Sequence, residues 1–512
     1  MKPLEEVLKD WEAVIGLEIH TELTTLTTKM FCGCKLEFGA APNTHTCPVC
    51  LGLPGALPVP NKAAIESIVL AGLATNCDIE KYSMFYRKNY TYPDLANNFQ
   101  ITQGPVAFCM RGWLDLEVDG AAAKERVDLA SARETGSYTT RIGITRIHME
   151  EDAGKLNHIG SADGRIAGAT HSLVDYNRCS TPLIELVTEP DFRSPEEARL
   201  FMQKLRQIYL ALGISDCSME EGSLRCDGNI SLRRRGETRL GTKTELKNMN
   251  SFKNLHDGLV YEICRQAEVL EEGGIIYQET RHWDPSTQHT IMMRQKETAD
   301  DYRLFPEPNL TPFELSDEFI ESVRAKLPEL PDEKAARFKE AFGLSAYDVR
   351  HLVEHRSTSD FFEACMAVAG ERALAKPVAN LIINDVTAWL NAHDGADLAD
   401  CALTPERAVE LVSLLSTDSI SSKQAKEVFA LVLEEDKDPA AIVAERGLEQ
   451  VSDVAAIEAV IEEVLAQNPD KVAQYRSGKT GLMGFFVGLC MKATAGQGNP
   501  KLINDLLAQK LG

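Results

Sequence analysis

The sequence has no run that approaches the ~20 consecutive apolar residues that a membrane-spanning helix needs. Its first ten residues, MKPLEEVLKD, have neither the apolar core of a secretory signal peptide nor the Arg-rich, acid-poor character of an organellar transit peptide. Internal repeats and low-complexity segments are also missing. These absences argue against membrane, secreted and repeat proteins, and we expect a cytoplasmic protein.

Positive charge is the second shortage. The 54 Lys and Arg residues face 77 Asp and Glu residues, which gives a formal net charge of −23. Such an acidic surface repels phosphate and excludes general nucleic-acid binding. The exception is the segment 467–512, where Lys and Arg exceed Asp and Glu by four charges. Contact with RNA is therefore expected only there, although a solvated helix face would have the same composition.

The chain also lacks the usual nucleotide-binding motif. Gly478-Lys479-Thr480 resembles the end of a phosphate-binding loop, but the required first glycine would be residue 473, which is Ala. Any nucleotide must therefore be bound by a metal ion and isolated cations.

Cysteine, in contrast, is plentiful, with 13 residues. Twelve residues separate Cys32-Gly-Cys34 from Cys47-Pro-Val-Cys50. Two closely spaced thiolate pairs allow a loop to fold over one tetrahedral zinc ion, and four thiolates leave no open position for catalysis. We therefore predict a structural zinc site, in which His45 could replace one thiolate. The alternative is four unrelated buried cysteines.

Two strand-like segments combine carboxylates with histidine. In Ile15-Gly-Leu-Glu-Ile-His20 the alternation places Glu18 and His20 on one face, and His148 and Glu150 repeat this pattern. Oxygen and imidazole ligands on rigid strands suit a hard divalent cation with open positions. We predict that Glu18, His20 and Glu150 bind Mg²⁺. Whether His20 binds directly or through water is left open.

At 512 residues the chain is too long for one core, and its patterns change along its length. Up to about residue 295, short β-rich stretches mix with two helices, one from Ser194-Pro195 to Gly213 and one from about Asn250 to Gly273-Gly274. Beyond the Pro-rich segment 327–332 the pattern is helical, with starts at Asp332, Thr404-Pro405 and Ser421. We predict an α+β domain followed by all-α domains.

Several long blocks resemble the family of the B subunit of the bacterial tRNA-dependent aspartyl/glutamyl amidotransferase, in the same order along the chain. Besides the two strand-like segments, these blocks are Arg87–Asp94, Thr181–Glu185, Met219–Asp227 and Thr244–Asn250. The resemblance implies a cradle-like catalytic domain (1–295) with the zinc loop, a helical domain (296–403), and a small helical tail (404–512) that contacts tRNA.

The resemblance also implies a reaction and partners. The family takes part in an ATP-dependent carbon–nitrogen ligase reaction that amidates misacylated Glu-tRNA(Gln) or Asp-tRNA(Asn). Its ammonia comes from an amidase subunit that hydrolyses glutamine, within a heterotrimer completed by a small third subunit. This chain has no recognisable amidase or glutaminase signature, so such a partner is required. The choice between the two misacylated tRNAs and the route of ammonia are left open.

Further residues are candidates for the catalytic, ATP-binding and tRNA-binding sites; most of them lie within the blocks that match the family. His148, Glu185 and Glu220 are expected beside the metal ligands as catalytic groups. Arg87, Lys88 and Lys155 are the candidate cations for ATP, and Lys479 and Lys492 are the candidate tRNA contacts in the tail. The alternative is a non-catalytic, zinc-stabilised tRNA-binding scaffold, in which these carboxylates only pair with Arg and Lys.

Overall fold

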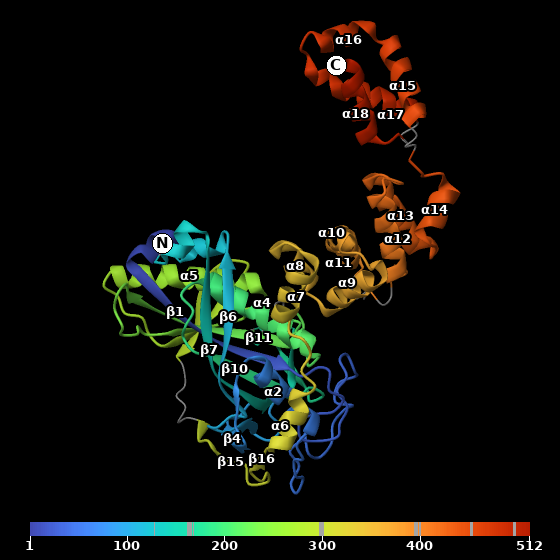
Figure 1. The fold of residues 1–512 in the computed structure, drawn as a ribbon. Coiled ribbons are helices and arrows are strands. Elements are labelled where there is room, and N and C mark those ends of the chain that lie inside the picture. Colours follow the sequence, from blue (N-terminus) through green and yellow to red (C-terminus); the bar gives the residue numbers. More distant parts are fainter. Residues whose placement is uncertain are drawn as a thin grey trace. The chain divides into compact units, whose positions relative to one another are not determined.

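A computed structural model describes the whole chain except residues 127, 161–165, 167, 296–301, 394–397, 399–400, 451–453 and 495–497. The chain forms two compact units, Met1–Leu330 and Pro331–Gly512 (Figure 1). The first is α+β and the second is helical, as the sequence predicts. Among the described residues, none of the helices has both the length and the apolar composition needed to cross a membrane.

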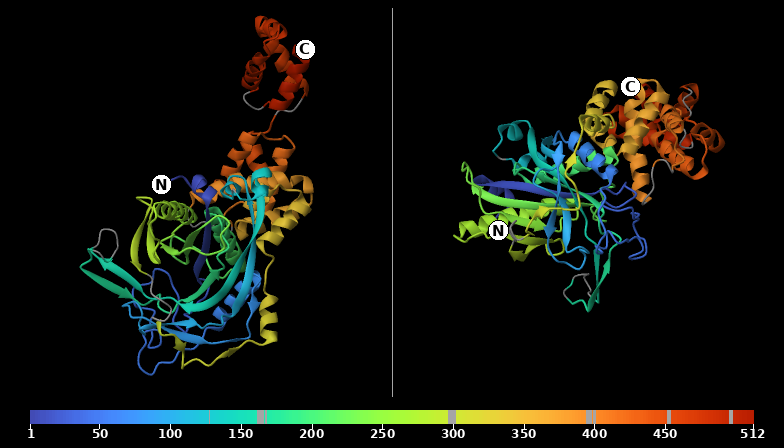
Figure 2. Two further views of the ribbon diagram at one scale, coloured as in Figure 1. Left: turned by 90° about the vertical axis from the view of Figure 1, so that its left-hand side faces the viewer. Right: turned by 90° about the horizontal axis from the view of Figure 1, so that it is seen from below.

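One large, mixed sheet is the centre of the first unit. The long strands β6 (Cys109–Asp119) and β7 (Ser137–Glu151) are paired and run side by side with a pronounced curve (Figure 2). β2 (Asp78–Ile79) pairs with β6. The main path of the sheet is β14 (His289–Gln295), β13 (Glu279–Asp284), β12 (Thr244–Lys247), β11 (Leu224–Arg234), β1 (Trp11–Glu22), β10 (Pro182–Thr188), β7, β5 (Phe99–Gln103), β4 (Phe85–Asn89) and β15 (Phe305–Pro306).

The sheet has one apolar face and one polar face because its strands alternate. In β1 the side chains of Ile15, Leu17 and Ile19 are buried in the core, while Glu18 and His20 point the other way. The apolar face is covered by α2 (Lys62–Ala74), α4 (Pro195–Leu212) and α5 (Phe252–Glu271), whose buried residues belong to the same core. Smaller elements of this unit are α1 (Leu4–Asp10), α3 (Ala130–Glu134), and the strand pairs β3 (Tyr82–Ser83) with β16 (Phe313–Glu314) and β8 (Lys155–Ile159) with β9 (His171–Asp175).

The predicted helix ends are confirmed by their caps. The Ser194 hydroxyl accepts from the Glu197 N–H at the start of α4, and Gly213 closes that helix with a left-handed φ of 66°. Ser251 caps α5 in the same way. Both ends of α4 and the start of α5 are therefore fixed by local contacts that do not depend on the sheet.

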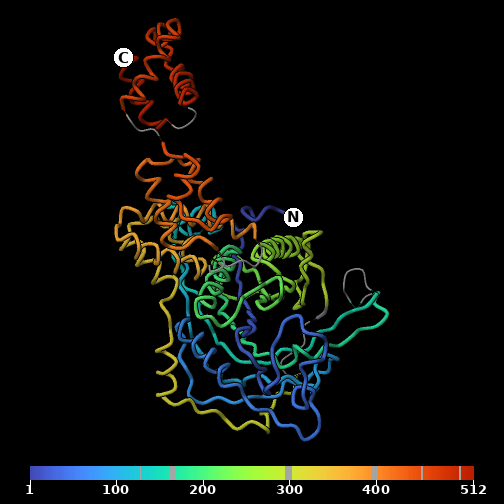
Figure 3. The backbone as a smooth tube through the Cα atoms, turned by 90° about the vertical axis from the view of Figure 1, so that its right-hand side faces the viewer, coloured from blue at the N-terminus to red at the C-terminus, as the bar shows by residue number. Residues whose placement is uncertain are grey.

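The first unit extends further than the expected limit at residue 295. β15 pairs with β4, β16 pairs with β3, and Leu315, Ile320 and Val323 join the first core. The last two of these residues lie on α6 (Asp317–Arg324). Figure 3 shows this segment in yellow, running along the blue N-terminal part. Residues 305–324 still pack against the first unit, which a change in composition along the sequence does not reveal. The limit expected from the sequence is therefore too early.

The second unit contains two separate hydrophobic clusters. One runs from Phe338 to Val443 and the other from Ile457 to Leu511. The expected limit at Thr404 falls inside the first cluster, because Ala408, Leu411 and Val412 are buried within it. The helices of this unit are α7 (Pro331–Phe342), α8 (Ala346–Leu352), α9 (Arg356–Ala369), α10 (Ala375–Asn380), α11 (Thr387–Ala392), α12 (Pro405–Ser416), α13 (Ser422–Glu435), α14 (Pro439–Arg446), α15 (Val454–Gln467), α16 (Pro469–Arg476), α17 (Met483–Ala493) and α18 (Pro500–Leu511).

Candidate active site and metal centre

Two histidines and two glutamates meet on the polar face of the sheet. Cross-strand pairing places His20 of β1 opposite Glu185 of β10, and Glu185 opposite His148 of β7. His148 Nε2 lies 3.2 Å from both Glu150 Oε1 and Glu185 Oε2, and His20 Nε2 lies 3.4 Å from Glu185 Oε2. Ligand atoms of His20, Glu150 and Glu185 all lie within 4.8 Å of one another. This donor set fits a hard divalent cation.

Neighbouring side chains hold Glu150 in place. The Thr102 hydroxyl donates to Glu150 Oε1 over 2.7 Å, and the Gln100 amide donates to Oε2 over 3.1 Å. Burial alone would raise the pKa of Glu150, but Lys88 and His148 lower it to about 2. Burial would lower the pKa of His148, but Glu185 and Glu150 raise it to about 9. A cation bound between the carboxylates would displace this proton, because both compete for the same oxygens.

Arg87 and Lys88 lie on opposite faces of the sheet, as adjacent strand residues must. Lys88 faces the cluster: Glu150 raises the pKa of its ammonium group, and its Nζ lies 5.2 Å from the centre of the Tyr302 ring. The Arg87 guanidinium instead forms a bidentate ion pair with Glu307, at 2.6 and 2.9 Å. The structure therefore brings only Lys88 of these two cations to the cluster.

Other expected site residues lie apart from the three potential ligands. Glu18 is on the correct face of β1, but it accepts a hydrogen bond from Asn229 of β11 instead of joining His20. Glu18 is therefore not among the side chains whose ligand atoms lie together. Glu220 is exposed in a turn, and Lys155 is exposed at the start of β8. Glu185 thus takes the place in the ligand group that the sequence assigned to Glu18.

A second charged cluster adjoins the first, and the sequence interpretation does not include it. Arg225 Nη2 lies 2.7 Å from Asp152 Oδ2 and 3.9 Å from Glu22 Oε1. Burial, together with the nearby Asp152, raises the pKa of Glu22 to about 8. Glu22 continues the alternation of Glu18 and His20 along β1, which is the signal that could have identified it.

The four predicted zinc ligands converge. The sulfur atoms of Cys32, Cys34, Cys47 and Cys50 all lie within 4.8 Å of one another, and those of Cys47 and Cys50 are 3.9 Å apart. Tetrahedral zinc with Zn–S bonds of about 2.3 Å requires sulfur atoms about 3.8 Å apart. The four cysteines therefore fit one zinc ion. His45 lies outside the group, with its Nε2 3.7 Å from Glu37.

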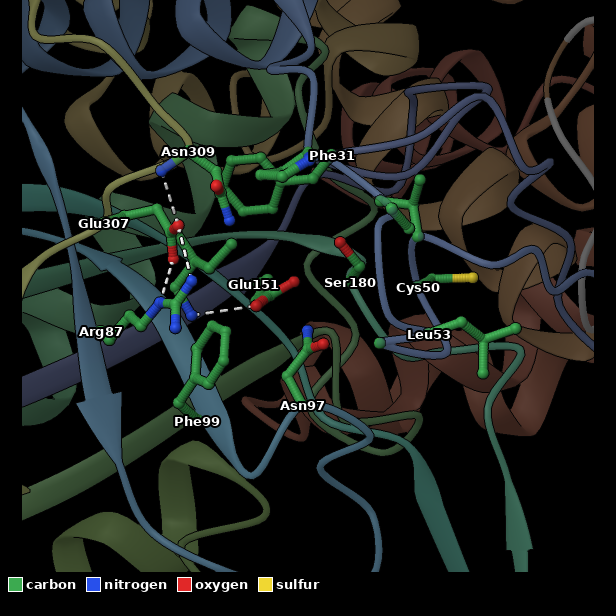
Figure 4. A pocket seen from close by; sticks show the side chains of 15 residues that line it. Phe31, Cys50, Leu53, Arg87, Asn97, Phe99, Glu151, Ser180, Glu307 and Asn309 are labelled. Carbon is green, nitrogen blue, oxygen red and sulfur yellow. Dashed lines mark hydrogen bonds and ion pairs between the residues drawn. The ribbon is translucent and has the colours of Figure 1, made fainter.

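A small cavity lies on the face of the sheet opposite the cluster. Figure 4 shows Arg87, Glu151 and Glu307 pointing toward it, with Cys50 of the metal loop in its wall. Its volume is about 180 Å³. Burial raises the pKa of Glu151 to about 7, and the backbone N–H of Ile101 donates to this carboxyl over 2.9 Å. The cavity is lined by both charged and apolar side chains, and the candidate cation site is separate from it.

The candidate tRNA contacts lie beside the C-terminal hydrophobic cluster of the second unit, from Ile457 to Leu511. Lys479 precedes α17 and Lys492 lies in its last turn. Lys479 and Lys492 are both exposed, whereas Lys510 pairs with Glu462 over 2.7 Å. Of the glycine-rich segment 496–500, residues 496 and 497 lie outside the described residues, and Asn499 caps α18.

Comparison with known proteins places this arrangement in a family. The model of the "GatB/GatE catalytic domain" family matches residues 13–321, and that of the "GatB domain" family matches residues 360–511. The B subunit of aspartyl/glutamyl-tRNA(Asn/Gln) amidotransferase from Carboxydothermus hydrogenoformans is 50% identical over 504 residues, which is 98% of this chain and 99% of the relative.

Two further relatives carry the same name. The protein from Geotalea daltonii is 50% identical over 502 residues, covering 98% of this chain and 99% of its own length. That from Acaryochloris marina is 48% identical over 503 residues, covering 98% of each chain. Matches of this length and identity cover the polar cluster, the cysteine loop and the helical tail together, and the chain belongs to the family of the aspartyl/glutamyl-tRNA amidotransferase B subunit.

Proposed function

We propose that this chain activates and amidates the side-chain carboxylate of Glu-tRNA(Gln), Asp-tRNA(Asn) or both, as the name of its relatives indicates. A carboxylate is inert toward ammonia because its leaving group would be an oxide. Transfer of the γ-phosphoryl group of ATP to a carboxylate oxygen releases ADP and gives an acyl phosphate. Ammonia then attacks the carbonyl carbon, phosphate leaves, and the nitrogen loses a proton.

The main support for this proposal is that His20, Glu150 and Glu185 converge beside Lys88. Mg²⁺ held by these three residues would neutralise the phosphates and the substrate carboxylate, which otherwise repel each other. Lys88 lies where it can pair with a phosphate oxygen. His148 contacts both carboxylates and fixes their orientation.

Partners and the second metal complete the proposal. Ammonia is supplied by an amidase subunit that hydrolyses glutamine, and a small third subunit completes a heterotrimer. Zn²⁺ on the four cysteines shapes the loop that borders the cavity on the reverse face. Lys479 and Lys492 contact the tRNA. The name shared by the relatives gives no support to a non-catalytic scaffold.

The decisive experiment uses the purified complex with misacylated Glu-tRNA(Gln) and ATP-Mg²⁺ but no ammonia donor. We expect phosphate or acyl-phosphate formation that depends on the tRNA, and conversion to Gln-tRNA when ammonium is added. A parallel reaction with Asp-tRNA(Asn) measures the substrate preference. No ATP cleavage with either tRNA, even with ammonium, would reduce the chain to a tRNA-binding scaffold.

The two neighbouring cations allow a sharper test. Lys88→Met should lower kcat/KM for ATP about 100-fold, because a cation facing the phosphates is lost. Arg87→Met should mainly destabilise the fold, by about 3–5 kcal/mol, because Glu307 would be left buried and unpaired. Steady-state kinetics and urea unfolding of both variants separate these effects. An equal loss of ATP use in both variants would contradict the assignment of Lys88 alone to the site.

A further inference from the structure

Lys29 is one of the few completely buried charged side chains of the described residues, with 0% of its surface exposed. Burying an ammonium group costs much free energy unless an anion and hydrogen-bond acceptors surround it. Among the described residues, however, no carboxylate lies within ion-pair distance of Lys29 Nζ. Its charge must be compensated by a different group.

The two contacts of the ammonium group identify this partner. Lys29 Nζ donates to the backbone oxygen of Tyr176 over 2.9 Å and lies 3.5 Å from Cys50 Sγ. The carbonyl is neutral, so Cys50 is the contact of the two that can carry a negative charge. Cys50 is also the buried member of the four-cysteine group, and the Cys47 N–H donates to its sulfur over 3.2 Å.

The charge of a zinc–thiolate centre explains this arrangement. Four thiolates around Zn²⁺ leave an excess of two negative charges, which is unfavourable in a partly buried loop. We propose that Lys29 is a positioning residue that balances this charge, holds the Cys50 thiolate, and ties the metal loop to the chain at Tyr176. The proposal rests on the proposed zinc site. It makes retention of the metal depend on a buried ammonium group that is not itself a ligand.

Backbone contacts agree with such a role. The Lys29 N–H donates to the backbone oxygen of Cys34 over 3.1 Å, so the lysine is part of the loop whose charge it balances. The Cys179 thiol donates to the backbone oxygen of Cys50 over 3.4 Å, which links the loop to the chain just beyond Tyr176. Both parts of the metal loop, near Cys34 and near Cys50, are therefore connected to Lys29 or to the chain that its side chain contacts.

The test compares Lys29→Gln, which keeps a hydrogen-bond donor but loses the charge, with Lys29→Arg, which keeps the charge. Zinc per chain and the rate of zinc transfer to a chromogenic chelator are measured in the full-length protein. We expect transfer about tenfold faster from Lys29→Gln and partial rescue in Lys29→Arg. The matched control is Lys35→Gln, since Lys35 lies in the same loop but is exposed and pairs with Glu37.

Each outcome decides one question. If wild-type protein from zinc-containing medium carries no zinc, the zinc site itself is refuted. Bound zinc that leaves wild type and Lys29→Gln at the same rate would refute the role of Lys29 alone.

A second measurement needs no variant and covers the case in which Lys29→Gln does not fold. Lysine-specific acetylation of the wild-type protein, read by mass spectrometry, should spare Lys29 while zinc is bound and modify it after the metal is removed by a chelator. Lys35 should react equally in both states. Continued protection of Lys29 in the metal-free protein would show that the thiolate centre is not what holds it, and would overturn the proposal.

Discussion

Replacing Glu150 by Gln should lower tRNA-dependent ATP cleavage by about 100-fold or more while leaving the protein folded. The change removes one of the two carboxylates of the ligand group but keeps the shape of the side chain. The amide oxygen can still accept from Thr102, and Glu185 still pairs with His148. The loss should therefore appear in chemistry and in the Mg²⁺ requirement, and only weakly in the unfolding curve.

The measurement is phosphate release with misacylated tRNA and ATP-Mg²⁺ in the absence of ammonia donors, together with thermal unfolding. Glu117→Gln is a suitable control, because Glu117 is an exposed carboxylate on β6 of the same sheet. If Glu150→Gln unfolded the protein but the remaining folded fraction cleaved ATP normally, the carboxylate would be structural. A higher Mg²⁺ concentration that restores part of the activity would instead support its role as a ligand.

Strand alternation explains how much of this site is readable from the sequence. It places His20 and Glu150 on polar faces, and the structure brings both into one group. Alternation cannot say which strands become neighbours, however. Glu185 reaches His20 because β10, far later in the chain, pairs with β1. Glu18 sits on the same face but meets β11 instead, so the prediction of Glu18 as a ligand is not supported by the geometry.

The same alternation separates Arg87 from Lys88. Adjacent residues of a strand point to opposite faces, so both cannot face one ATP molecule, and the prediction of Arg87 as a partner of ATP has no support in the geometry. Helix starts are readable because they depend on local chemistry: the cap residues Thr404 and Ser421 stand directly before α12 and α13. The limits of the two units depend on long-range packing, such as the packing of residues 305–324 with the first unit. The sequence pattern carries no information about this packing.

Ending the chain at Gln450 should weaken tRNA binding about tenfold or more at moderate salt. This truncation removes the C-terminal hydrophobic cluster, from Ile457 to Leu511, together with the positively charged segment 467–512. The protein as a whole has a net charge of −23, so losing the cations of this segment removes a favourable electrostatic interaction with RNA. No other positively charged segment that could replace it is evident in the sequence. A cut at Thr404, in contrast, would open the cluster from Phe338 to Val443 and unfold more than the tail.

Glutamine hydrolysis by the amidase partner should remain nearly normal in the truncated complex, since the first unit and the hydrophobic cluster from Phe338 to Val443 are unchanged. Filter binding or fluorescence anisotropy at several salt concentrations measures the loss, and the salt dependence should become shallower as phosphate contacts disappear. Lys479→Ala/Lys492→Ala tests the two proposed contacts within the full chain. Lys423→Ala/Lys426→Ala removes the same charge from exposed positions of α13 and should change binding much less. Equal tRNA affinity with and without residues 451–512 would show that RNA binds elsewhere, and the excess of lysine and arginine in the tail would then be a solvated helix face.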